Sequence, residues 1–177
     1  ALMRLGYIDE AKAFTRWTAE LPRHDPHDGH LRIMYALDGS PIGEEIDLDH
    51  LAGYADSRPV RIGNAAATQL QLDIFGALLD SIYLSNKYGE AISHADWVGV
   101  CKVVNYVCDN WQRPDAGIWE GREPKREHLH SQLMCWVAVD RALRLAGKRS
   151  LRAPFDRWIA ARNEISRYIW ETFWNDE

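Results

Sequence analysis

The sequence has few cysteines and no long hydrophobic run, and each of these absences argues against a class of protein. Its 177 residues include three cysteines, Cys101, Cys108 and Cys135, without a C-x-x-C pair. This odd number argues against both a disulfide framework and a zinc ribbon. No apolar run approaches the ~20 residues that span a bilayer, so no membrane partner is expected. Because the cysteines have apolar neighbours and no leader is visible, we expect a reducing, cytoplasmic location.

The chain also lacks an excess of positive charge. It carries 21 basic and 26 acidic side chains, a formal net charge of −5. Its densest basic stretch, residues 122–126, is interrupted by Glu123 and followed by Glu127. Nucleic-acid binders need clustered Lys and Arg, so no nucleic-acid partner is expected. Apolar residues make up 46% and charged residues 27%, which is the balance of a globular chain that can bury a sizeable core.

Helical periodicity is what the sequence does contain, because apolar residues recur three or four positions apart in five segments. Turn and capping residues bound these segments. No long stretch alternates apolar and polar residues as a strand would. We therefore predict an all-α chain, with one short strand over residues 31–37. The expected helices cover residues 8–21 with Asp9 as cap, 71–88 behind the N-cap Asn64, 93–111 with Ser93 and Asp96 as a capping box, 129–146 ending at Gly147, and 154–173 starting at Pro154.

Two connections between the helices are long, residues 22–62 and 112–128, whereas those around Gly89 and Lys148 are short. Long loops in a compact domain are usually functional. If successive helices form antiparallel hairpins, connections alternate between the two ends of the helical layer. Both long loops then lie at one end, and we predict a working face there.

The second long loop places Trp119 beside Glu120, between Gly117 and Gly121. An aromatic ring offers an apolar face to a sugar, and low-polarity surroundings can keep a neighbouring carboxyl protonated. The alternative is that Trp119 covers the end of the helical layer and that Glu120 is solvated. Spacing alone leaves both interpretations open.

Two further pairs of side chains lie on or near the long loops. Arg58 and Arg61, beside a helix start, could hold hydroxyls or an anion; alternatively they pair with the acidic stretch 44–49. His128 and His130 lie close to the Trp-Glu loop, where contact with a substrate and a capping or packing role are both open.

A run of histidines, His24, His27 and His30, recurs at every third position. Three imidazoles can bind Zn²⁺. However, Pro26 and Gly29 prevent the helix that would align them. A polar loop is therefore favoured, and neither a metal nor a cofactor is expected.

Three blocks of the sequence carry a resemblance to a known family: residues 57–66 with 69–73, residues 117–120 with Arg122, and residues 134–142. Together they resemble glycoside hydrolase family 15, which contains glucoamylases, glucodextranases and some trehalases. The resemblance runs from Leu5 to about Ala146. It implies an (α/α)6 toroid of twelve helices whose active site lies in the loops at one end of the inner ring, in agreement with the predicted working face. Residues 1–177 would then be a single partial domain, about half of the toroid, truncated at both ends.

The resemblance also implies a reaction, the inverting hydrolysis of terminal α-linked glucose from oligosaccharides, as in glucoamylases, with trehalose as a variant substrate. Glu120 is the implied general acid, Trp119 shapes the pocket for the terminal glucose, and Arg58 and Arg122 bind the substrate. A second carboxylate activates water about 6.5–9.5 Å away in such a reaction. The resemblance places this general base beyond the end of the chain, so the 177 residues alone are expected to be inactive.

Two other functions stay open at this point. One is a non-catalytic glucan-sensing or regulatory module, because the regulatory subunits of phosphorylase kinase also resemble this family. The other is a helical interaction module, which would bind no sugar. We also expect self-association through apolar flanks on the first and fifth helices. The sequence leaves open which substrate is cleaved: a malto-oligosaccharide, an isomaltose-type sugar or trehalose.

Overall fold

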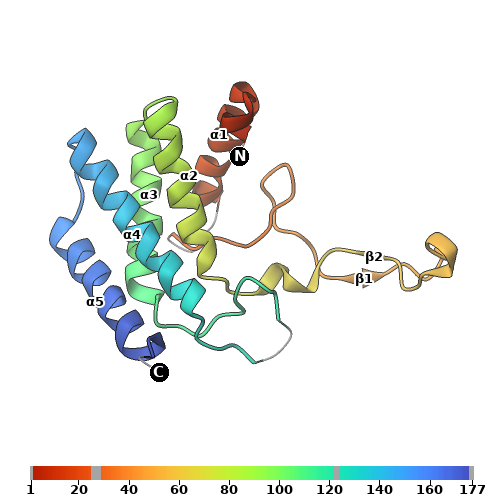
Figure 1. The fold of residues 1–177 in the computed structure, drawn as a ribbon. Coiled ribbons are helices and arrows are strands. Elements are labelled where there is room, and N and C mark those ends of the chain that lie inside the picture. Colours follow the sequence, from red (N-terminus) through yellow and green to blue (C-terminus); the bar gives the residue numbers. More distant parts are fainter. Residues whose placement is uncertain (1, 25–28, 122–123, 176–177) are drawn as a thin grey trace. The chain divides into compact units, whose positions relative to one another are not determined.

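A computed structural model describes residues 2–24, 29–121 and 124–175. The chain divides into two compact units, residues 1–31 with 71–177 and residues 32–70, and each is described by itself. The first unit is helical, which confirms the all-α prediction (Figure 1). After a short 3₁₀ turn, η1 (Leu2–Leu5), it consists of α1 (Ile8–His24), α2 (Asp73–Tyr88), α3 (His94–Asn110), α4 (Leu129–Arg149) and α5 (Phe155–Phe173).

The second unit contains a small two-stranded sheet instead of the predicted strand. β1 (Ile46–Asp47) and β2 (Arg61–Ile62) pair antiparallel, beside the 3₁₀ helices η2 (Tyr54–Asp56) and η3 (Ala65–Thr68). The strand predicted over residues 31–37 is wrong, because this segment contributes an isolated bridge between Tyr35 and Pro41. The hydroxyl of Tyr35 accepts the amide hydrogen of Arg32 at 2.8 Å, which takes up a donor that a strand ladder would use.

Within the helical unit, α2 and α4 both begin at the end where the connection between α3 and α4 lies (Figure 1). The short connections, from α2 to α3 and from α4 to α5, lie at the opposite end. α4 packs against α2, α3 and α5. The second long loop therefore lies at the starts of α2 and α4, as the alternation predicts. Most of the first long loop belongs to the second unit.

The core follows most of the predicted stripes but not all of them. In α2, Phe75 and Leu79 are fully buried. In contrast, Ile8 and Phe14 of α1 are 44% and 54% exposed, and Leu133 of α4 is 46% exposed, so these apolar residues of the helical pattern lie outside the core. α1 buries only part of its apolar face against α2 and α3. α4 buries its face of small side chains instead: Cys135, Ala138, Ala142 and Ala146.

The predicted cap at Ser93 is confirmed, and three other predicted caps are corrected. Asp9 lies inside the first turn of α1, which begins at Ile8. The Ser93 hydroxyl accepts from the amide of Asp96 at 3.1 Å and donates to the Asp96 carboxylate at 2.6 Å. Asn64 does cap a helix, but the helix is η3, because extended backbone follows it before α2 begins. α4 continues through Gly147 and ends at Ser150, which takes the left-handed conformation (φ 51°) expected at a helix end.

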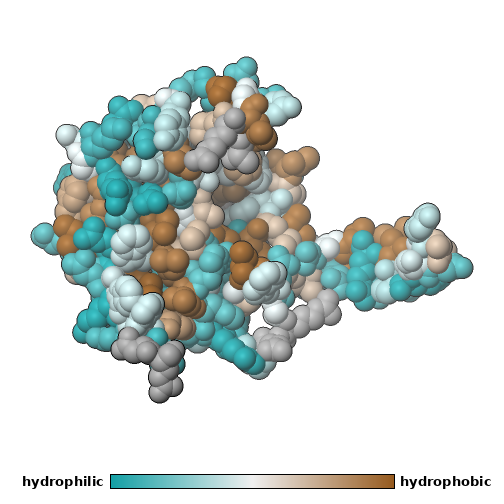
Figure 2. All heavy atoms as spheres, in the orientation of Figure 1, coloured by the Kyte–Doolittle hydropathy of each residue, from teal (hydrophilic) through white to brown (hydrophobic). Residues whose placement is uncertain are grey.

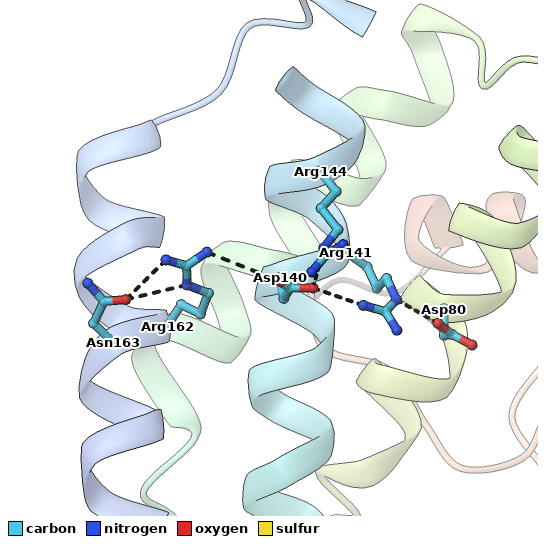
Figure 3. Close-up of polar contacts among 6 residues, drawn as sticks. All are labelled: Asp80, Asp140, Arg141, Arg144, Arg162 and Asn163. Atoms are coloured by element: carbon cyan, nitrogen blue, oxygen red, sulfur yellow. Dashed lines mark hydrogen bonds and ion pairs between the residues drawn. The ribbon is translucent and has the colours of Figure 1, made fainter. Parts of the chain in front are cut away.

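A buried carboxylate on α4 takes part in a network of ion pairs that links this helix to α2 and α5 (Figure 3). Asp140, with its side chain 4% exposed, accepts from Arg141 at 2.8 Å and from Arg144 at 2.7 Å. Arg162 of α5 lies 3.8 Å from its other oxygen. Arg141 also donates to Asp80 of α2 at 2.7 Å. Because a buried charge without partners costs several kcal/mol, the three guanidinium groups allow Asp140 to be buried and connect α2, α4 and α5.

The surface of the helical unit keeps some apolar side chains. In Figure 2, hydrophobic residues are interspersed with hydrophilic ones over the face of the molecule that is shown. At the end of α5, Trp170 and Trp174 are 59% and 61% exposed, with ring centroids 5.0 Å apart. This is one of the flanks through which self-association is predicted. Among the described residues, no helix combines the length and apolar character that crossing a bilayer requires.

A glycine sets how closely α2 and α4 approach each other. A Cβ atom at Gly76 would lie 2.3 Å from the carbonyl oxygen and 2.8 Å from the Cβ atom of Met134. No side chain larger than hydrogen fits between these backbones without moving one of the helices. Gly76 therefore allows α2 and α4 to pack backbone against backbone.

We predict opposite effects for two glycine-to-alanine substitutions in helix interiors. Gly76→Ala should lower the free energy of unfolding by about 1–3 kcal/mol, because the methyl group overpacks the contact with Met134. Gly99→Ala in α3, where a Cβ meets nothing within 4 Å, should raise it by about 0.5–1 kcal/mol. Urea denaturation measures both, and a shift of the same sign for the two variants would contradict the close approach.

Candidate active site

The loop that carries Trp119 and Glu120 is closed at its base by backbone hydrogen bonds. The Asp115 amide donates to the Arg126 carbonyl at 2.9 Å, and the Arg126 amide donates back at 3.1 Å. Trp119 is 89% exposed and Glu120 is exposed as well. Trp119 therefore does not cover the end of the helices, which removes that half of the alternative interpretation. Both side chains can meet a ligand from solvent.

Asp115 attaches this loop to the helices. Its side chain is 1% exposed, and its Oδ2 accepts from the Leu72 amide at 2.8 Å and from the Ser131 hydroxyl at 2.8 Å. Leu72 is the residue just before α2, and Ser131 lies in the first turn of α4. One carboxylate therefore holds the base of the loop on the starts of two helices.

The turn that presents Glu120 depends on Gly117. Gly117 has φ +65°, and a Cβ atom there would lie 3.0 Å from the His128 ring. This contact favours the packing role for His128, whereas His130 is exposed. Glu120 itself has φ +52°, and its amide donates to the Gly117 carbonyl at 3.4 Å. A non-glycine residue in this region costs about 1–3 kcal/mol, and such strain is concentrated at functional sites.

Several polar side chains are buried beneath the loop, although polar residues are mostly exposed in proteins. Gln132, 1% exposed, donates to the Trp111 carbonyl at 2.8 Å. Burial raises the pKa of Asp73, while a backbone hydrogen bond and the nearby His130 lower it. Sequence reasoning missed these residues and Asp115, because a loop aspartate gives no local sign that it will be buried.

Of the two arginines predicted to bind substrate, Arg58 and Arg122, only Arg58 lies within the described residues. Arg58 lies in the second unit, is exposed, and donates to the Asp49 carbonyl at 3.2 Å. Arg61 pairs with Asp47 at 2.7 Å and with Glu45 at 3.4 Å, which confirms the acidic-stretch alternative for this residue. Arg122 lies outside the described residues.

Of the histidine run, His27 lies outside the described residues. The His30 ring packs edge-on against Tyr106, with centroids 5.5 Å apart. Over the described ranges, no group of three or more His, Cys, Asp or Glu side chains could hold a metal ion.

The cysteines are free and are poor nucleophiles. Burial raises the pKa of Cys108 to about 11, and it raises the pKa of Cys135 as well. Because the thiolate is the reactive form, neither thiol is suited to nucleophilic attack at neutral pH. This leaves the Trp119–Glu120 loop as the candidate site.

The chain is similar to known proteins over most of its length. A sequence profile described as "Glycosyl hydrolases family 15" matches residues 1–177. The trehalase of Mycobacterium tuberculosis is 37% identical over 171 residues, which are 96% of this chain and 25% of that protein. Trehalase 1 of Sulfolobus acidocaldarius is 41% identical over 143 residues, 80% of this chain and 25% of that protein.

A third relative, the trehalase of Thermoplasma acidophilum, is 33% identical over 176 residues, which are 99% of this chain and 28% of that protein. The chain therefore spans about a quarter of the length of these curated relatives. No solved structure is significantly similar to it.

We predict that Gly117→Ala loosens the loop more than it affects the helices. The methyl group would meet the His128 ring and a left-handed backbone, so the amides of Asp115 and Arg126 should exchange with deuterium faster than in the parent chain. Gly147→Ala is the matched control, because a Cβ there meets nothing within 4 Å. Unchanged exchange at both amides in Gly117→Ala would show that the loop does not depend on this turn.

Proposed function

This chain belongs to glycosyl hydrolases family 15, and on that premise we propose that it supplies the acid side of an inverting hydrolysis of trehalose. The sequence blocks alone favoured terminal α-linked glucose of oligosaccharides, with trehalose as a variant. The relatives, which are named trehalases and are 33–41% identical, support trehalose as the substrate. The observation that carries the proposal is the exposed Trp119–Glu120 pair on a loop whose base is fixed to α2 and α4.

Glu120 is the proposed general acid. Its carboxyl donates a proton to the glycosidic oxygen as the bond from that oxygen to the anomeric carbon breaks, and one glucose leaves. Water attacks the anomeric carbon from the opposite face, so this carbon inverts from α to β. A second carboxylate takes the proton of that water. We propose that this base lies outside these 177 residues, about 6.5–9.5 Å from Glu120 in the complete site.

Trp119 and two arginines are the proposed substrate-binding residues. The exposed indole of Trp119 offers an apolar face on which a glucose ring can lie. Arg58 donates one hydrogen bond to the Asp49 carbonyl, and its other N–H groups can bind sugar hydroxyls. Arg122, two residues beyond Glu120, is assigned by resemblance alone.

We predict that Glu120→Gln lowers glucose release from trehalose by about 10²–10⁴-fold, because the leaving oxygen is no longer protonated. The assay follows glucose from trehalose, maltotriose and isomaltose, with the full-length protein and with the 177-residue chain. Glu164→Gln is the matched control, since Glu164 is an exposed glutamate on α5.

A Glu120→Gln rate equal to that of the parent protein would refute the acid assignment. Faster release of glucose from maltotriose than from trehalose would favour a glucoamylase-type substrate over trehalose. Sugar binding without hydrolysis in the full-length protein would favour the non-catalytic module, and a chain that binds no sugar would favour the interaction module.

A further inference from the structure

We infer that Asp115 is a positioning residue for Glu120, which holds the acid at a fixed place relative to the starts of α2 and α4. This inference rests on the proposed role of Glu120 as general acid. Asp115 acts through the loop, since the residue is 1% exposed and its Oδ2 accepts two hydrogen bonds from within the protein.

The surroundings of Asp115 explain how a carboxylate can be buried there. Its Oδ2 lies 2.8 Å from both the Leu72 amide and the Ser131 hydroxyl. These donors belong to the N-terminal ends of α2 and α4, which carry partial positive charge. Two hydrogen bonds and two helix ends therefore stabilise the carboxylate. A side chain without an oxygen at this position, such as that of alanine, would leave the Leu72 amide without its acceptor.

Asp115 also joins the two chain segments that form the base of the loop. The backbone of Asp115 is paired in both directions with Arg126, at 2.9 and 3.1 Å. Glu120 lies between these two residues, and its position follows from theirs and from the turn at Gly117. A movement of the Asp115 side chain away from the helix starts would therefore move the whole loop.

Such a movement matters because a general acid works only within hydrogen-bonding distance of its target, about 2.6–3.2 Å. A displacement of ~1 Å can cost roughly 10²-fold in rate. Trp119 and Glu120 are exposed, and the buried Asp115 side chain holds the base of their loop on the starts of α2 and α4. This attachment resists such a displacement.

The test compares two substrates in the full-length protein. Trehalose needs a protonated leaving group, whereas α-glucosyl fluoride does not, because fluoride leaves without a proton. If Asp115 only positions the acid, Asp115→Ala should lower kcat on trehalose by about 10²-fold with little change in KM. Its rate on α-glucosyl fluoride should change little. A general loss of folded enzyme would lower both rates equally.

Two milder variants make the test independent of how well Asp115→Ala folds. Asp115→Asn keeps an oxygen that can accept from the Leu72 amide, so it should recover part of the trehalose rate. Ser131→Ala removes one of the two donors and should have a smaller effect of the same kind. All three variants should change the ratio of the trehalose rate to the fluoride rate in the same direction as Glu120→Gln.

Equal losses on both substrates, or no loss on either, would overturn the inference while leaving the proposed function intact. Failure of the proposed function gives a different result, because Glu120→Gln would then hydrolyse trehalose at the parent rate. In that case the Asp115 inference fails with it.

Discussion

The approach of α2 to α4 at Gly76 is the constraint on which the rest of the site depends. The Cβ position of this glycine falls against the backbone of Met134, so the two helices cannot slide without losing this contact. Leu72 precedes Gly76 by one helical turn, and Ser131 precedes Met134 by three residues. The contact therefore fixes the two N-terminal ends side by side. Only in that arrangement can one carboxylate, that of Asp115, reach donors on both helices at 2.8 Å.

Two of the buried carboxylates of the helical unit, those of Asp140 and Asp115, are stabilised in different ways. Asp140, on α4, is surrounded by the guanidinium groups of three arginines, and this network connects α4 to α2 and α5. Asp115 instead uses an amide, a hydroxyl and the ends of two helices. The first arrangement stabilises the helical layer. The second connects that layer to the loop, so the chemistry proposed for Glu120 depends on how the helices pack.

Much of the helical layer could be predicted from the sequence, because periodicity and caps such as Ser93 are local signals. The site was predictable only as far as Trp119 and Glu120, which adjacent residues and a family resemblance identify. The role of Asp115 could not be predicted, since its partner Leu72 is 43 positions away in the chain. From the sequence alone, Gly76 is expected to destabilise its helix. The close packing of α4 against α2 explains why a glycine stands at this position.

We propose that Glu120 protonates the glycosidic oxygen of trehalose. The most direct test is a crystal structure of the full-length Glu120→Gln variant with trehalose bound, because the substitution preserves shape while slowing turnover. We expect the side chain at position 120 to lie about 2.6–3.2 Å from the glycosidic oxygen, with a glucose ring against Trp119. Trehalose bound with its glycosidic oxygen beyond hydrogen-bonding distance of position 120 would contradict it.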